Sequence, residues 1–308
     1  VDTDTSESNS TSESTSGDGD GDTGATVDID LVLSDNPDMS IAPFADIAVA
    51  DASEVRIIVS QGGEELFTRV VSDIDPDDAS GVRTFVWGLE AETTYEIRAQ
   101  ADLPEGLGES AAMSYTTGSL PDDTPELSVT MHDETRAHQG LVVFGSKTNG
   151  VQVYVGVNPA GKIVWYHETG GAGNKLNGDL KVMADGRFML MTPDGARVIE
   201  PWGEVVWEYD TTYHHDLTPM PNGNLLILGR ANTIINVPLL GGDVQVQLDT
   251  IEEVTPSGDQ VRFWRADDHL DTQYFPSELS QGGPPYDWTH GNAAYYDADN
   301  DRVLLSAR

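Results

Sequence analysis

The feature that most constrains the fold of this chain is a sequence repeat in its second half. The segment Gly161–Tyr166 recurs as Gly203–Tyr209 and, more loosely, as Gly258–Trp264. A second element recurs as well, because Asp179–Leu190 and Asp216–Ile227 share their apolar alternation and a central turn. A repeat of roughly 40 residues that contains several short strands is typical of the blades of a β-propeller. The sequence therefore predicts an all-β fold with propeller blades in this region.

The repeat boundaries divide this region into about three and a half blades. The boundaries fall at 138–178, 179–212 and 213–270, and a fourth blade begins at residue 286. A closed propeller needs roughly four to eight blades. We therefore expect residues 127–308 to be the N-terminal part of a longer propeller domain. The dipeptides Asp185-Gly186 and Asn222-Gly223 predict tight hairpin turns, in which glycine takes a positive φ.

The region before the repeat has a different pattern. Short β-rich runs such as Val55–Ser60 and Tyr95–Ala99 alternate with clusters of Gly, Pro and Asp, which indicates antiparallel strands. Tyr95 is placed like the tyrosine corner of a fibronectin type III sandwich. We expect a small β-sandwich over residues 29–119 and a proline-containing linker over residues 120–126.

Residues 1–28 have the composition of a tether. They alternate Ser, Thr, Asp, Glu and Gly, and they contain no aromatic and no basic residue. Such a segment buries too little apolar area to offset the entropy that folding would cost. We therefore expect a disordered acidic tether ahead of the sandwich.

The composition excludes several functions. The formal net charge is −37, and Lys and Arg are too few to neutralise a phosphate backbone, so nucleic acid is excluded as a partner. No cysteine is present, which rules out disulfides, thiolate chemistry and cysteine-bound zinc. No apolar run reaches the ~18 residues of a membrane helix, so no transmembrane segment is expected.

The last residues of the chain carry the first group of candidate site residues. Strands at Asn292–Tyr295 and Val303–Ala307 are predicted to form a hairpin around an Asp/Asn turn. Side chains two positions apart share a strand face, so His290 and Asn292 are expected to point the same way. The hairpin would return Arg308 to the level of His290. A titratable imidazole, a neutral donor and a fixed cation together suit an oxyanion with three oxygens.

Three motifs, taken together, resemble the bacterial arylsulfate sulfotransferases. They are Tyr213–Leu217, Pro221–Leu226, and Asp287–Asn292 followed by Arg308. The resemblance implies an exported six-bladed propeller with a small N-terminal β domain. It also implies transfer of a sulfuryl group from a phenolic sulfate ester to a phenol. The transfer would pass through a sulfohistidine intermediate and use no nucleotide sulfate donor and no cofactor.

The same resemblance implies a set of site residues. His290, Asn292, Arg308 and one histidine of the His214-His215 pair would line the central channel. The nucleophilic histidine would come from a later blade, beyond residue 308. A histidine directly beside aspartate is the commoner family pattern, which favours His215. Strand alternation instead favours His214 as the counterpart of His290, so both histidines remain candidates.

Other interpretations of these residues stay open. The run His214-His215-Asp216 also fits a metal site or a turn cluster. The chain would be a non-catalytic, surface-exposed propeller that binds a ligand or a protein if no later histidine completed the site. Export to the periplasm or the cell surface, with a lipid-anchored tether, is a further expectation. Four histidines have no partner pattern and are expected at the surface: His132, His138, His167 and His269.

Overall fold

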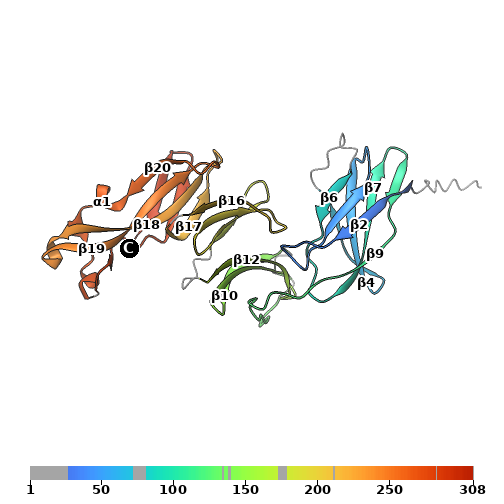
Figure 1. Ribbon diagram of the computed structural model, residues 1–308, viewed down its shortest axis with the longest axis horizontal. Helices are drawn as coiled ribbons and strands as arrows, with labels where there is room; N and C mark the ends of the chain where they lie inside the picture. The colour runs from blue at the N-terminus through green and yellow to red at the C-terminus, as the bar shows by residue number, and fades with distance from the viewer. Residues whose placement is uncertain are drawn as a thin grey trace, which may run out of the picture.

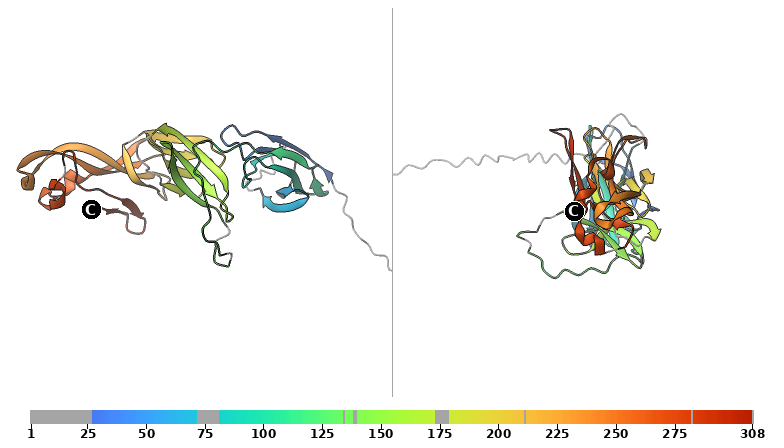
Figure 2. Two further views of the ribbon diagram at one scale, coloured as in Figure 1. Left: turned by 90° about the horizontal axis from the view of Figure 1, so that it is seen from below. Right: turned by 90° about the vertical axis from the view of Figure 1, so that its left-hand side faces the viewer.

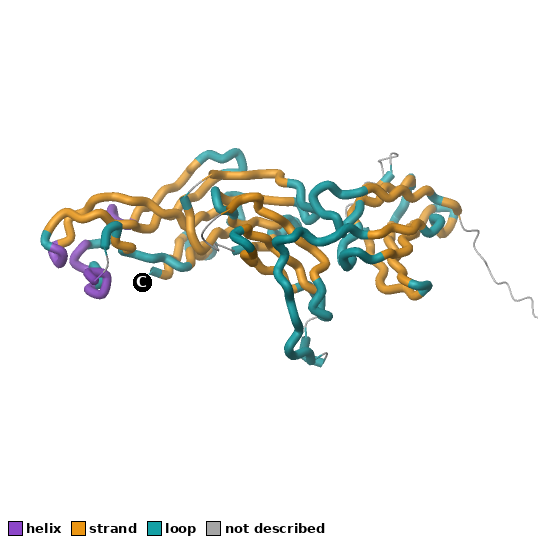
Figure 3. The backbone as a smooth tube through the Cα atoms, turned by 60° about the horizontal axis from the view of Figure 1, so that its bottom comes forward, coloured by secondary structure: helices purple, strands orange, loops and turns teal. Residues whose placement is uncertain are grey.

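The computed structural model describes residues 27–71, 81–133, 135–137, 140–172, 179–210, 212–281 and 283–307. Almost all regular structure in these ranges is strand (Figure 3). The helices described are α1 (Ala266–His269) and three short 3-10 turns at Pro238–Leu240, Thr272–Tyr274 and Ser277–Gln281. None of these helices is long and apolar enough to cross a membrane. The predicted all-β class is confirmed, and the predicted tether over residues 1–28 lies almost entirely outside the described residues.

The N-terminal region forms two packed sheets. One sheet has the order β1-β8-β7-β4-β5, with β9 also paired to β7, and the other has the order β2-β3-β6. The strands are β1 (Val27–Asp28), β2 (Asp30–Ser34), β3 (Phe44–Ala48), β4 (Glu54–Gln61), β5 (Glu64–Val70), β6 (Val82–Phe85), β7 (Thr94–Leu103), β8 (Gly106–Glu109) and β9 (Met113–Thr116). In Figure 1 these strands form the blue-to-teal end of the molecule.

Alternating side chains build the core of this sandwich. Along β7, Tyr95, Ile97, Ala99 and Ala101 are buried while the residues between them face outward. Because side chains of a strand alternate between its two faces, this pattern buries one face against the second sheet. The Tyr95 hydroxyl accepts a hydrogen bond of 2.9 Å from the backbone N–H of Glu90. This bond is the one that a tyrosine corner makes, so the predicted corner is confirmed.

The second region is a series of antiparallel sheets. The first holds β10 (Val142–Thr148), β11 (Val151–Val157) and β12 (Ile163–Ala172). The second holds β13 (Leu180–Val182), β14 (Phe188–Met191), β15 (Gly195–Ile199) and β16 (Val205–Asp210). The third holds β17 (Tyr213–Pro219), β18 (Leu225–Val237), β19 (Gly242–Val254) and β20 (Gln260–Arg265), with β21 (Tyr286–Asp287) paired in parallel to β19. The fourth holds β22 (Ala293–Asp297) and β23 (Arg302–Ser306). The first three sheets follow the boundaries predicted from the repeat, except that Tyr286–Asp287, where the fourth blade was expected to begin, pairs with the third sheet, and the number of blades and their closure stay a prediction.

The repeat is visible in the details of these sheets. In each of the first three sheets, the last two strands share a register shift near the same end, at Gly156/Val157, Val198/Ile199 and Glu253/Val254, and the first sheet carries a second shift at Val151/Val153. Gly186 and Gly223 have φ values of 88° and 84°, which confirms the two predicted turns. Equivalent sequence positions therefore take equivalent backbone conformations in successive sheets.

The sandwich packs directly on the first sheets of the second region. Met39 and Ile41, between β2 and β3, are fully buried in one core cluster with Tyr154 of β11 and Trp165 of β12. The backbone N–H of Ser40 donates to the Tyr166 hydroxyl at 2.8 Å. The molecule consequently extends along one axis, with the sandwich at one end and the third sheet at the other (Figure 2).

Candidate functional site

The first histidine pair lies at the start of β17, where the strand is irregular. The register between β17 and β18 shifts between Tyr213 and Leu217, and His215 has a φ of 65°. His214 and Asp216 are buried, at 1% and 7% exposure, whereas the ring of His215 is exposed. The predicted alternation is therefore confirmed, and it separates the two histidines into a buried one and an accessible one.

The buried histidine contacts a buried carboxylate of the same sheet. Nε2 of His214 lies 2.7 Å from Oδ1 of Asp249, and Asp249 is 2% exposed. Burial by itself would raise the pKa of Asp249, but hydrogen bonding to His214 and Thr289 holds this pKa below its usual value. Because an ionised carboxylate only accepts, Nε2 of His214 carries the proton of this bond. Nδ1 of His214 has no hydrogen-bond partner among the described residues.

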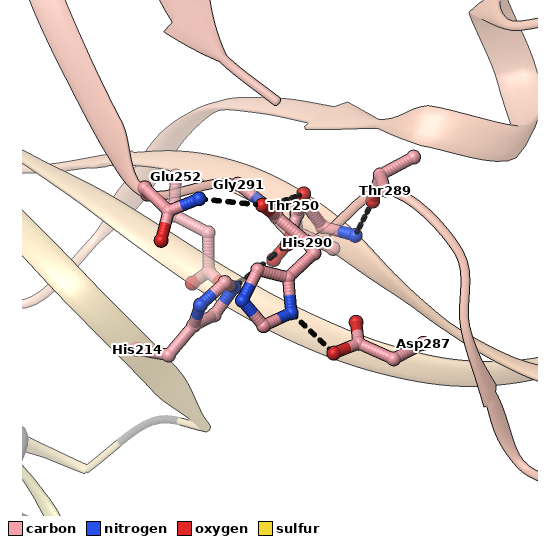
Figure 4. A network of polar contacts seen from close by, with 9 residues as sticks. His214, Thr250, Glu252, Asp287, Thr289, His290 and Gly291 are labelled. Carbon is pink, nitrogen blue, oxygen red and sulfur yellow. Dashed lines mark hydrogen bonds and ion pairs between the residues drawn. The ribbon is translucent and has the colours of Figure 1, made fainter. Parts of the chain in front are cut away.

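The second site segment runs from β21 (Tyr286–Asp287) to the start of β22. β21 pairs in parallel with β19, and the backbone N–H of Trp288 donates to the carbonyl of Gln247 at 2.8 Å. His290 then takes a φ of 43°, and its Nδ1 contacts Oδ2 of Asp287 (Figure 4). Pairing with β19 thus positions the His290 ring beside the third sheet.

The residues on either side of His290 are bound to Asp249. The backbone N–H of Gly291 donates to Oδ2 of Asp249 at 2.6 Å, and the backbone N–H of Asp249 donates to Oγ1 of Thr289 at 2.9 Å. A Cβ atom at Gly291 would lie 2.7 Å from Oδ2 of Asp249. Only glycine leaves room for so close an approach of the carboxylate, which explains the residue type at this position.

These two segments bring three imidazoles together. The ring centroid of His215 lies 5.0 Å from that of His214 and 5.8 Å from that of His290. The pKa of His215 is lowered, first by partial burial and then by repulsion from His214, His290 and Arg230. His215 therefore stays neutral to a lower pH than an isolated histidine does, and a neutral imidazole can accept a proton from a bound hydroxyl.

The strand prediction at Asn292 needs a correction. β22 begins at Ala293, and both His290 and Asn292 precede it, so strand alternation does not relate these two side chains. The physical cause is the left-handed turn at His290, which the bonds to β19 impose. The Asn292 side chain is exposed, and its Nδ2 donates to the carbonyl of His290 at 3.0 Å.

The predicted return of the hairpin holds as far as the chain is described. β23 ends at Ser306, and the backbone N–H of Asn292 donates to the carbonyl of Ser306 at 2.8 Å. The chain after β23 is thus led back beside the His290 segment. Arg308 itself lies outside the described residues.

One carboxylate of the third sheet, Asp249, was missed in the sequence, and the role of a second, Asp216, was not foreseen. Asp249 follows Leu248 in a strand whose apolar residues alternate with polar ones, so nothing in the local sequence distinguished it from an exposed aspartate. Asp216 accepts from Lys181 Nζ at 2.9 Å and from the backbone N–H of Ala294 at 2.8 Å. It was recognised only as part of a possible metal or turn cluster. Within the described part of the chain, no three His, Asp or Glu side chains converge as a metal site requires.

One of the four remaining histidines is not at the surface as expected. His167 on β12 is 7% exposed, and its Nε2 has no partner among the described residues. Burial, and to a lesser degree Arg197, lowers the pKa of His167 to about 4. It is buried because the face of β12 that carries it packs inward. His132 is exposed, His269 is exposed and stacks on Trp264, and His138 lies outside the described residues.

Comparison with known proteins places the second region in a family. No curated protein matches the chain. One similar solved structure is the FN1-FN3 domains of chicken CNTN1, which is 10% identical and covers 78% of this chain and 97% of its own, with a TM-score of 0.24. So low a TM-score carries no argument about the fold. The family model described as arylsulfotransferase (ASST) matches residues 126–308. The chain therefore belongs to the arylsulfotransferase family.

Proposed function

We propose that the protein transfers a sulfuryl group from a phenolic sulfate ester to a phenol. The observation that carries this proposal is the approach of His215 and His290, whose ring centroids lie 5.8 Å apart inside the region that matches the arylsulfotransferases. Two imidazoles at this separation can serve the two oxygens between which the sulfuryl group moves. No nucleotide donor and no metal is required for this chemistry.

The balanced reaction has two steps. In the first, the S–O bond of the donor breaks, an S–N bond forms on a histidine, and the departing phenolate receives a proton. In the second, the acceptor phenol loses its proton, its oxygen attacks sulfur, and the S–N bond breaks. The resemblance puts the sulfohistidine beyond residue 308, so the histidines of this chain are proposed to move protons rather than to carry the sulfuryl group.

The described side chains suit different parts of these steps. Asp287 accepts from Nδ1 of His290, which leaves Nε2 of His290 to face the leaving oxygen. His215, with its lowered pKa, suits removal of the acceptor proton. One N–H of the Asn292 amide is used by the His290 carbonyl, and the second remains a donor for a sulfuryl oxygen. Arg308 is proposed, from the resemblance alone, as the cation that binds the sulfuryl group.

A transfer assay on the full-length protein tests this proposal. The protein is incubated with 4-nitrophenyl sulfate and an excess of phenol, without a nucleotide sulfate, and both products are measured. We expect 4-nitrophenol and phenyl sulfate in equal amounts, with release that depends on the acceptor. Release of inorganic sulfate without phenyl sulfate would show a hydrolase. Binding of the ester without turnover would favour the non-catalytic alternative.

Export stays a prediction of the sequence. The acidic composition of residues 1–28 supports it, because such a segment suits a solvated spacer behind an anchored N-terminus. Fractionation of cells that express the full-length protein would test it, and recovery in the cytosol would contradict it.

A further inference from the structure

Asp249 is the one described side chain that binds both histidine segments of the site. Its Oδ1 pairs with Nε2 of His214 at 2.7 Å, and its Oδ2 accepts from the backbone N–H of Gly291 at 2.6 Å. Its own backbone N–H donates to the hydroxyl of Thr289 at 2.9 Å. Figure 4 shows His214, Thr289, His290 and Gly291 gathered at this point. The carboxylate therefore links β17, β19 and the segment before β22.

The environment of Asp249 indicates that its contacts are specific. It is 2% exposed, and an ionised carboxylate so deeply buried is costly unless both oxygens are paired. Leu248, its neighbour in the same strand, is 1% exposed and belongs to an apolar core cluster. Because neighbouring side chains of a strand point to opposite faces, Leu248 packs in that core while Asp249 faces the histidine segments. What an apolar residue could not supply is the pair of bonds to His214 and Gly291.

A second carboxylate fixes the same segment from the other side. Asp216 accepts from the backbone N–H of Ala294 at 2.8 Å, while Asp249 accepts from that of Gly291. The two amides lie on either side of Asn292. The third sheet therefore bonds to the backbone at both ends of the short stretch that follows His290. Of these two bonds, the one to Gly291 is the nearer to His290 in the chain.

We propose that Asp249 is a positioning residue for the transfer reaction. Through Gly291 and Thr289 it sets the place of the His290 ring, and through His214 it fixes the Nε2–H tautomer of the imidazole that packs against His215. This inference rests on the proposed function for its kinetic consequence. Its geometric consequence is independent of turnover, because the tautomer of His214 and the bond to Gly291 exist without substrate.

Replacement Asp249→Asn tests both parts of this inference together, namely the position of the His290 ring and the tautomer of His214. Asparagine keeps the size of the side chain and can accept from Gly291, but its NH₂ group then faces Nε2 of His214. His214 must change to the Nδ1–H tautomer, and Nδ1 has no partner among the described residues. Nitrogen NMR of the imidazoles should report the change. We expect kcat to fall by on the order of 10²-fold, since small displacements of reacting groups have costs of that size.

Replacement Gly291→Ala tests the position of the His290 ring alone. It also keeps the inference testable if Asp249→Asn fails to fold. The added methyl group would lie 2.7 Å from Oδ2 of Asp249 and would displace the segment, whereas His214 bonds to the other oxygen, Oδ1, and both of these side chains are unchanged. We expect the His290 ring signals to shift, the His214 tautomer to be retained, and kcat to fall with little change in KM. The matched control is Asp243→Asn, an exposed aspartate of the same strand that accepts from Asn236 at 2.9 Å, which should leave all three readouts unchanged.

The outcomes separate this inference from the proposed function. The positioning role is supported if His290 signals and kcat change together in Gly291→Ala, and if the His214 tautomer changes only in Asp249→Asn. It is overturned if both variants fold with wild-type imidazole signals, or if they turn over at the wild-type rate. A wild-type protein without transferase activity would contradict the proposed function alone, because the NMR comparison still decides whether Asp249 positions the two histidines.

Discussion

The sandwich and the third sheet bury different kinds of side chain. The buried polar residues of the described sandwich are uncharged: Asn36, Ser110 and Thr117. The third sheet buries five titratable groups, which are His214, Asp216, Asp249, Glu252 and Glu253. Charges in the sandwich, such as the ion pair between Arg56 and Asp102, lie on its partly exposed surface.

This difference distinguishes residues that stabilise the fold from residues that position the groups of a site. Buried charges are expensive, and replacing a buried ion pair by apolar groups is often neutral or stabilising. A sheet that buries several titratable groups therefore gains little stability from them. For His214, Asp216 and Asp249, the value lies in the geometry that they impose on the segments that carry His215 and His290. Mutations in the sandwich should therefore lower the free energy of unfolding, and mutations in the third sheet should lower the transfer activity.

The largest expected effect is on activity at His290. His290→Gln should lower kcat/KM by on the order of 10²–10⁴-fold, which is the usual contribution of a general acid or base. The loss should grow as the pKa of the leaving phenol rises, because a poorer leaving group depends more on protonation. Rates with a series of substituted phenyl sulfates would show this trend.

The control for this prediction is His269→Gln, since His269 is exposed and stacks on Trp264 away from the other histidines. It should leave the rates unchanged. If His290→Gln lowered the rate equally for all phenyl sulfates, His290 would not protonate the leaving group.

An apolar truncation in the sandwich should have the opposite character. Ile97→Ala removes a fully buried side chain of β7 and should lower the free energy of unfolding of the sandwich by about 2–5 kcal/mol. The kcat of the transfer reaction should not change at temperatures where the variant is folded. Urea unfolding followed alongside kinetics would test both statements. A drop in kcat without a drop in stability would remove the distinction between the two regions.

A smaller effect, on the pH dependence of stability, is expected at His167, which is a buried titratable residue of the first sheet. Its pKa is about 4 in the folded protein and about 6.5 when unfolded, so the unfolded chain binds a proton first as the pH falls. The free energy of unfolding should therefore decrease between pH 6.5 and pH 4, by about 3 kcal/mol in total, and this contribution should level off below pH 4.

His167→Gln isolates this contribution, because glutamine is polar and does not titrate. The difference in unfolding free energy between the variant and the wild type should depend on pH over this interval. Urea unfolding at several pH values would measure it. A pH-independent difference would mean that His167 does not change its protonation on unfolding.

Much of the fold was predictable because it depends on local patterns. The repeat gave the sheet boundaries, the glycines at 186 and 223 gave the turns, and Tyr95 gave the corner. Each of these signals is contained within a short segment, where strand alternation and turn chemistry act directly. The packing of Met39 and Ile41 against the first sheets was not predictable, because it joins residues more than a hundred positions apart.

The sequence predicted which residues belong to the site but not how their side chains are oriented. His215 and His290 were named from motifs, and the structure brings their rings together. The left-handed turn at His290 and the outward side chain of Asn292 were missed, because bonds to β19 impose them rather than the local sequence. The irregular start of β17 likewise exposes His215 and brings its ring beside that of His290, whereas strand alternation had favoured His214 as the counterpart of His290.

The most direct measurement of whether His215 and His290 form one site is a double-mutant cycle. Transfer from 4-nitrophenyl sulfate to phenol would be measured for the wild type, His215→Gln, His290→Gln and the double variant. Because residues that act as a unit have non-additive effects, the double variant should lose little more than the worse single variant. Losses that multiply, or single variants that transfer at the wild-type rate, would contradict a shared site.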